Sequence, residues 1–169
     1  MRRVGILAGL VLIGGVSAAS AQRSTRDVAI HDAAGKEVGR ASVRDSLGTM
    51  LFHFAVNGLP QGTHGVHVHE AAKCEGPGFE SAGPHYNPHL KEHGRRNPKG
   101  PHLGDLGNIV VDASGKGTRN VGVTGPETRR GMDAWLENGH SIVIHANADD
   151  EMTDPAGNSG ARIACAVLK

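Results

Sequence analysis

Two histidines spaced two residues apart carry the clearest chemistry in this sequence. The segment 62–70, GTHGVHVHE, alternates apolar and polar residues, a pattern typical of a β-strand. Side chains two apart in a strand point to the same face, so His67 and His69 would emerge together. Imidazole nitrogens bind zinc and copper. The pair predicts a metal-binding site formed by two side chains of one strand, although an isolated pair of this kind is more often an exposed polar pair.

Most of the 11 histidines fall in or beside two segments, 71–106 and 146–160, which are rich in glycine, proline, asparagine and charge. Long loops that persist in a compact domain are usually functional. Asp105 follows His102 by three residues and adds an oxygen donor. Three imidazoles and one carboxylate match a closed tetrahedral zinc site, whereas an all-imidazole set with an open face suits copper(II). The histidines concerned are His64, His67, His69, His85, His89, His93, His102 and His145.

The elements that must position these side chains are short and β-rich. Turn signals separate several of them, and the clearest are DAAG at 32–35 and DASG at 112–115. Eight short strands with this punctuation predict an all-β, antiparallel sandwich or barrel. The segment 127–137 predicts one or two helical turns in which Met132, Trp135 and Leu136 pack inward. The expected strands are 27–31, 37–43, 49–56, 64–69, 107–111, 118–123, 141–145 and 162–167.

The start of the chain predicts export. Arg2 and Arg3 precede the uncharged run 4–19, and Ala19-Ser20-Ala21 follows, so residues 1–21 match a secretory signal peptide cleaved after Ala21. A membrane anchor is the alternative, but the run is shorter than the roughly 20 apolar residues that a spanning helix needs. Residues 22–169 then form one domain that is periplasmic or secreted, with no membrane anchor once the signal is removed.

Charge and cysteine content narrow the possibilities further. The formal net charge is +1, which provides no electrostatic footprint for a nucleic-acid partner.

The two cysteines are Cys74 and Cys165, and export would place them in an oxidising compartment, where a pair usually becomes a disulfide. We therefore predict a Cys74–Cys165 bridge. A reactive thiol is the alternative, but neither cysteine lies in a C-x-x-C motif.

Six motifs follow one another along the chain: GVHVHE (65–70), SAGPHYNP (81–88), HG (93–94), HLGDLGN (102–108), IHANADD (144–150) and GNSGARIAC (157–165). In order and spacing they resemble the motifs of copper,zinc superoxide dismutases of the bacterial exported type, from about residue 28 to the end. The resemblance implies an eight-stranded antiparallel Greek-key barrel with two long functional loops. It also implies dismutation of superoxide to dioxygen and hydrogen peroxide, an antioxidant defence, in a monomer or homodimer.

The resemblance further implies one copper ion and one zinc ion per subunit. His85 would bridge the two metals, which requires that its ring lose both N–H protons, as two adjacent dications permit. The implied copper ligands are His67, His69, His85 and His145, and the implied zinc ligands are His85, His93, His102 and Asp105.

Roles beyond direct ligation also follow from the resemblance. Asp149 would accept hydrogen bonds from the far nitrogens of His67 and His93, which fixes their tautomers. Arg162 would hold the anionic substrate above the open copper face. Copper would alternate between two oxidation states, so that one superoxide leaves as dioxygen and the next as hydrogen peroxide. His85 would carry a proton, and zinc would have no redox role.

Supporting and steering roles complete the prediction. His64 would support the copper site by packing and hydrogen bonding. The second loop contains Asp150, Glu151 and Asp154, which would repel an anion. Since the second loop would not attract the substrate, cations of the segment 71–106 would supply the positive field instead. These cations are Lys91, Arg95, Arg96 and Lys99.

Two other classes of function compete with the enzyme. A non-enzymatic metal-binding module would lack a copper ligand or Arg162, or would add a C-x-x-C metal-transfer domain, and the sequence shows none of these marks. An extracellular adhesion sandwich would account for the strands but for none of the histidines.

Overall fold

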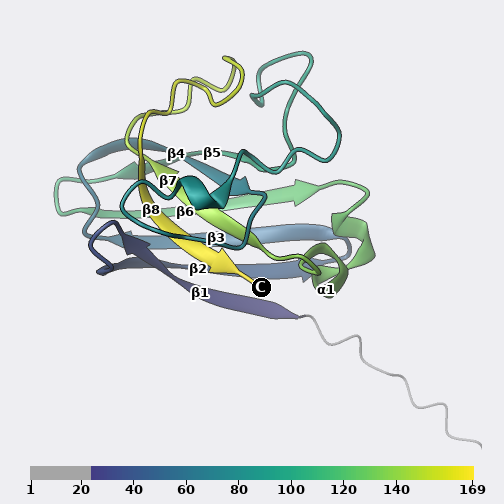
Figure 1. The fold of residues 1–169 in the computed structure, drawn as a ribbon, viewed down its shortest axis with the longest axis horizontal. Helices are drawn as coiled ribbons and strands as arrows, with labels where there is room; N and C mark the ends of the chain where they lie inside the picture. Colours follow the sequence, from purple (N-terminus) through teal and green to yellow (C-terminus); the bar gives the residue numbers. More distant parts are fainter. Residues whose placement is uncertain (1–23) are drawn as a thin grey trace, which may run out of the picture.

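The computed structural model describes residues 24–169, so the predicted signal peptide, 1–21, lies outside the described residues. Eight antiparallel strands form a nearly closed barrel (Figure 1), which confirms the predicted all-β architecture. In the sheet the strands follow the order β5-β4-β7-β8-β1-β2-β3-β6. The strands are β1 (Thr25–Asp32), β2 (Glu37–Ser46), β3 (Thr49–Asn57), β4 (Gly62–His69), β5 (Asp105–Val111), β6 (Lys116–Thr124), β7 (His140–His145) and β8 (Arg162–Leu168).

The turn between β1 and β2 shows why the sequence reverses direction at that point. Asp32 Oδ1 accepts hydrogen bonds from the backbone N–H groups of Ala34 and Lys36, both at 2.9 Å. Gly35 follows with φ of 79°, a conformation that glycine adopts without strain. The 112–115 turn between β5 and β6 repeats this pattern. Both predicted hairpin turns are therefore confirmed.

The core fills the barrel with alternate residues of its strands. In β3, Phe52 and Phe54 point inward and are almost fully buried. The 3-10 turn η2 (Thr128–Arg130) and the short helix α1 (Met132–Trp135) confirm the helical turns predicted for 127–137. The Trp135 ring packs edge-to-face on Phe52 with ring centroids 6.0 Å apart, and Met132 and Leu136 are also buried. The helical segment thus completes the core.

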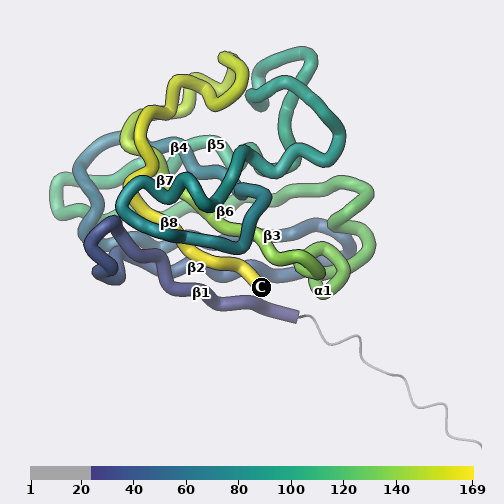
Figure 2. Tube along the Cα trace, in the orientation of Figure 1, coloured from purple at the N-terminus to yellow at the C-terminus, as the bar shows by residue number. Residues whose placement is uncertain are grey.

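Two long loops rise from the same end of the barrel. The first connects β4 to β5 and includes the 3-10 turn η1 (Glu80–Ala82), and the second connects β7 to β8. Figure 2 shows the first loop in teal and the second in yellow, next to each other above the strands. The backbone N–H of Arg96 in the first loop donates to the carbonyl of Glu151 in the second at 3.0 Å. Among residues 24–169 no helix is long and apolar enough to span a membrane.

Candidate metal centre

Strand β4 lies between β5 and β7 and carries the His67–His69 pair. Both side chains are 0% exposed, which excludes the alternative of a solvent-facing polar pair. The β4–β5 ladder shifts register between Gly65 and His67, and the shift sets Asp105 opposite His67. A bulge of this kind redirects side chains beside functional sites. Strand β4 therefore brings two imidazoles to one place, and β5 sets Asp105 opposite one of them.

Four histidines from three separate segments meet at the loop end of the barrel. One ring nitrogen from each lies within 4.8 Å of the others, an arrangement that could hold a metal ion. Each ring offers the group one buried nitrogen with no hydrogen-bond partner among the described residues: Nδ1 of His67 and Nε2 of the other three. Buried polar atoms are rarely left unpaired. We call this set the four-histidine cluster; it comprises His67, His69, His85 and His145.

The opposite nitrogens of these rings are held by acceptors. His67 Nε2 lies 2.9 Å from Asp149 Oδ2, His69 Nδ1 lies 2.8 Å from the Gly83 carbonyl, and His145 Nδ1 lies 3.1 Å from the Gly160 carbonyl. Carbonyl and carboxylate oxygens only accept, so these far nitrogens carry the protons. The inner nitrogens therefore present lone pairs toward one another, as metal ligands do.

Burial keeps the rings of the cluster neutral. It lowers the pKa of His67 to about 3, of His69 to about 2 and of His145 to about 4. The pKa of His85 is also lowered, first by burial. Charging a buried imidazole without a partner is costly. At neutral pH the lone pairs are therefore free to bind a cation.

A second group forms around Asp105. Its Oδ1 lies 3.1 Å from Nδ1 of His85, 3.0 Å from Nδ1 of His93 and 3.3 Å from Nδ1 of His102. Nδ1 of His85 and Nδ1 of His102 are 3.4 Å apart. The other oxygen, Oδ2, accepts from the backbone N–H groups of Gly94 and His102, both at 2.9 Å. These bonds hold the carboxylate with Oδ1 facing the three rings, and we call this set the Asp105 group.

His85 belongs to both sets. Its Nδ1 faces Asp105, and its Nε2 is the unpartnered nitrogen in the four-histidine cluster. His67 also lies within 4.8 Å of the Asp105 group, but its Nε2 is bonded to Asp149 and its free Nδ1 serves the cluster. The short contacts to Asp105 single out His102, and not His67, as the fourth member of this group. The two sets therefore meet at one imidazole.

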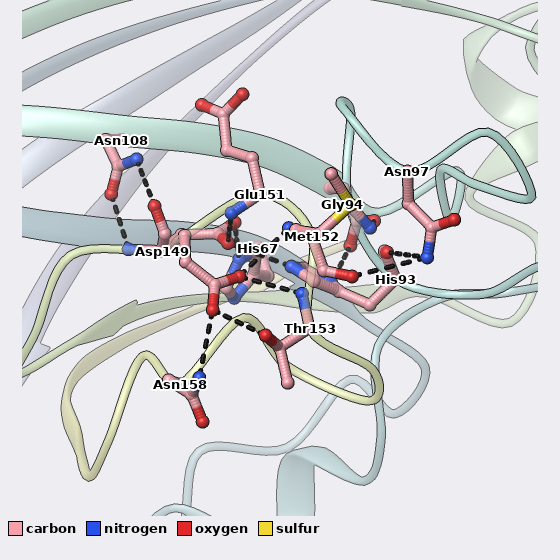
Figure 3. A network of polar contacts seen from close by, with 12 residues as sticks. His67, His93, Gly94, Asn97, Asn108, Asp149, Glu151, Met152, Thr153 and Asn158 are labelled. Carbon is pink, nitrogen blue, oxygen red and sulfur yellow. Dashed lines mark hydrogen bonds and ion pairs between the residues drawn. The ribbon is translucent and has the colours of Figure 1, made fainter.

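Asp149 connects the two sets from outside. Its Oδ2 lies 2.9 Å from His67 Nε2, and its Oδ1 lies 2.9 Å from His93 Nε2, as Figure 3 shows. Asn108 holds the backbone of Asp149 on both sides: its Nδ2 donates to the Asp149 carbonyl at 2.8 Å, and its Oδ1 accepts from the Asp149 N–H at 2.7 Å. The sequence reasoning missed this role of Asn108, although the residue lies in the HLGDLGN motif.

The charges of this bridge are consistent with a bound cation. Burial would raise the pKa of Asp105, but its hydrogen bonds to three histidines hold it well below the usual range, and the same balance lowers the pKa of Asp149. Burial would lower the pKa of His93, but its contacts with these two carboxylates outweigh that effect and raise it to about 9. The protein thus concentrates negative charge where a proton or a metal ion can neutralise it.

Arg162 is fixed beside the four-histidine cluster. Its two terminal nitrogens donate to the carbonyls of Phe79 at 2.7 Å and of Gly83 at 2.8 Å. The Gly83 carbonyl also accepts from His69, so one backbone oxygen positions both side chains. The Cys74–Cys165 disulfide is present, as predicted, and it ties the first loop to β8 three residues beyond Arg162. Arg162 also lines a surface hollow of about 380 Å³.

The remaining predicted residues take different positions. His64 lies between two carbonyls, with Nδ1 2.8 Å from that of His145 and Nε2 2.9 Å from that of Pro60. Lys99 pairs with Glu92 at 2.9 Å. Lys91 and Arg95 line a different hollow, of about 360 Å³, next to His102. These cations therefore do not line the Arg162 hollow, and their predicted steering role stays a prediction.

The barrel thus holds two adjoining sets of buried side chains that could each bind a metal ion, and one imidazole belongs to both sets. The family described as copper/zinc superoxide dismutase matches residues 37–168. The chain belongs to this family, as predicted from its motifs, and the family uses copper and zinc.

Individual relatives agree with this assignment. Superoxide dismutase [Cu-Zn] 2 of Aquifex aeolicus is 38% identical over 98% of this chain and 97% of its own length. The solved Cu/Zn superoxide dismutase from Brucella abortus superposes with a TM-score of 0.68 at 29% identity, covering 86% of this chain and 100% of that one. A crystal structure of a SOD-like protein from Bacillus subtilis gives a TM-score of 0.74 at 40% identity, covering 85% of this chain and 97% of that one.

Proposed function

We propose that this protein dismutates superoxide, with copper in the four-histidine cluster and zinc in the Asp105 group. The observation that carries the proposal is a set of four converging imidazole nitrogens that have no hydrogen-bond partner within residues 24–169. An all-imidazole set suits copper. The far nitrogens are already bonded to oxygens, so the tautomer that ligation needs is in place before any metal arrives.

The Asp105 group supports zinc. Zinc bonds of about 2.0–2.1 Å in a tetrahedron place neighbouring ligand atoms about 3.3 Å apart. The contacts within the group are 3.0–3.4 Å. Histidine nitrogens and aspartate oxygens are both zinc ligands. A zinc ion there would take the place of the proton on His93 Nδ1, which faces Asp105, while His93 Nε2 would keep its proton and donate to Asp149.

Copper, when bound, would supply one-electron chemistry, in which two superoxide ions and two protons become one dioxygen and one hydrogen peroxide. The protein's own residues then have definite tasks. Arg162 offers a fixed positive charge to the anion, since its guanidinium is tethered by two carbonyls. His85 can hold a proton at Nε2 while its Nδ1 remains with the Asp105 group. Asp149 keeps His67 and His93 in their ligating tautomers, and His64 anchors the backbone of His145.

The same proposal extends to residues 1–21 as a signal peptide and to a mature domain, 22–169, exported to the periplasm or beyond. The Cys74–Cys165 bridge supports it, because disulfides persist mainly in oxidising compartments. The non-enzymatic alternative gains no support, because all four histidines and Arg162 are present and positioned.

Pulse radiolysis of superoxide decay tests the proposal. We expect fast decay with protein loaded with copper and zinc, and none above background with protein loaded with zinc alone. Arg162→Gln should lower the rate constant about tenfold or more at unchanged copper content, because a positioned charge is lost. Arg129→Gln, a matched loss of an exposed arginine, should leave the rate unchanged. The proposal would be contradicted by a superoxide decay rate that does not depend on copper, or by equal rates for both variants.

A further inference from the structure

The hollow that contains Arg162 is shaped by the first loop. Its lining comes from Pro77, Gly78 and Glu80 on one side and from the segment 160–162 on the other. Arg162 holds the carbonyls of Phe79 and Gly83, the two residues that flank η1, so its guanidinium lies directly against this turn. Glu80, the first residue of η1, lines the same hollow as Arg162.

Glu80 keeps its carboxylate free at this place. The side chain is exposed, and among residues 24–169 it makes no ion pair. The Glu80 carboxylate lies against Gly78, and a Cβ atom at position 78 would overlap with the carboxylate oxygens. Gly78 thus leaves room for the charge to lie over the hollow. Burial lowers the pKa of Arg162, and Glu80 is the charge that opposes this effect, which places the two groups within electrostatic reach.

The charge balance of the hollow follows directly. Arg162 and Glu80 are the charged residues among its lining, and the others are proline, glycine and alanine. The acidic residues of the second loop, Asp150, Glu151 and Asp154, do not line this hollow. Asp150 binds Thr153 and Asn158 within its own loop, and Asp154 accepts from the backbone of His93. The negative charge that an incoming anion meets next to Arg162 therefore comes from Glu80.

We propose that Glu80 is a specificity-determining residue that weakens anion capture by Arg162, because its carboxylate shares the hollow without neutralising the guanidinium by direct pairing. The inference rests on the proposed function, in which the captured anion is superoxide. Glu80 would slow the entry of superoxide and would also limit occupation of the site by other small anions, such as chloride.

The size of the effect follows from the size of the hollow. A sphere of about 380 Å³ is about 9 Å across, so the carboxylate lies roughly 5–9 Å from an anion at Arg162, and Coulomb's law in water gives about a two- to fourfold effect on association. Salt screens it, because the Debye length falls from about 30 Å at 0.01 M to about 8 Å at 0.15 M. At the higher salt concentration less than about a twofold effect should remain.

The test uses Glu80→Gln with two controls. Glu137→Gln removes one exposed carboxylate that does not line the Arg162 hollow, and so matches the change in net charge. Glu80→Asp keeps the charge and reports on the fold of η1. Superoxide decay is measured by pulse radiolysis at low and physiological salt. Chloride binding is measured by chloride NMR line width on protein loaded with zinc alone, which needs no catalytic turnover.

We expect Glu80→Gln to raise the superoxide rate constant and the chloride affinity about two- to fourfold at low salt, with a smaller gain at physiological salt. Glu80→Asp and Glu137→Gln should both match the wild type. Wild-type values for Glu80→Gln, or equal losses in both Glu80 variants, would overturn the proposal. If the wild-type protein does not accelerate superoxide decay, the proposed function fails, and the chloride measurement still decides the role of Glu80.

Discussion

The carboxylate of Asp149 should control copper binding and zinc binding differently. Within the described part of the chain its Oδ2 hydrogen-bonds with His67 only, whereas its Oδ1 accepts from both His93 Nε2 and the Glu151 N–H, at 2.9 and 2.6 Å. In Asp149→Asn, the amide has one accepting oxygen and one donating NH2 group. The oxygen should take the Oδ1 position, where two donors point at it. The NH2 group would then face the N–H of His67, so the copper side loses its acceptor.

The expected magnitude follows from the role of such outer hydrogen bonds. Losing one typically costs 10- to 100-fold in metal affinity, or about 1.4–2.7 kcal/mol. Copper affinity should therefore fall about 10- to 100-fold, while zinc affinity should fall less than about threefold. Competition with a chelator, titrated separately for each metal, measures both values.

Asp150→Asn is the matched control. It makes the same chemical change one residue along the chain, at an exposed carboxylate that binds only within its own loop. It should leave both affinities unchanged. The reasoning is refuted if Asp149→Asn alters neither metal, or if it weakens zinc and spares copper.

Three further predictions follow. Replacing both cysteines by serine opens a loop with a sequence separation of 91 and should lower the free energy of unfolding by about 4–5 kcal/mol in the chain-entropy model; an unchanged thermal midpoint would contradict it. Asn97→Ala removes donors to the carbonyls of His93 and Met152, at 3.0 and 3.3 Å, and should speed zinc release and amide exchange in the second loop; unchanged exchange would show that Asn97 does not link the loops. The metal-free protein should lose stability as pH falls from 6.5 to 5, because burial lowers the pKa of three cluster histidines. The unfolded chain then takes up protons that the folded chain does not. At pH 5 this should lower the free energy of unfolding by about 2 kcal/mol for each histidine. His93, whose pKa is raised to about 9, contributes a constant amount in this window, and denaturant unfolding that shows no loss would refute the account. The three histidines are His67, His69 and His145, with pKa values of about 3, 2 and 4.

The strands were predictable because alternation is a local signal. All eight expected strands are present, and their differences lie at the ends: β6 spans Lys116–Thr124 where the pattern predicted 118–123. Lys116 and Gly117 resemble turn residues by type, but pairing with β3 continues through them. Tertiary pairing therefore extends strands beyond what local composition indicates. The turn η1 was not predicted, because its surroundings are rich in glycine and proline.

The site was predictable only in part. Period-two spacing was enough to place His67 and His69 on one face, but it could not show that the rings point inward. The meeting of His85 with Asp105 depends on a long loop, and the motifs indicated it only through resemblance to a family. The carbonyls of Gly83 and Gly160 fix two cluster rings, and backbone acceptors leave no mark in side-chain patterns. The position of Glu80 likewise depends on how η1 folds.

The central claim is that the four-histidine cluster holds a redox copper while the Asp105 group holds zinc. The most direct test is metal content by mass spectrometry, combined with superoxide decay, for the mature protein and for His145→Ala. We expect one copper and one zinc with fast superoxide decay in the wild type, and retained zinc with loss of both copper and decay in the variant. Full zinc without copper-dependent decay in the wild type, or a variant as fast as the wild type, would contradict it.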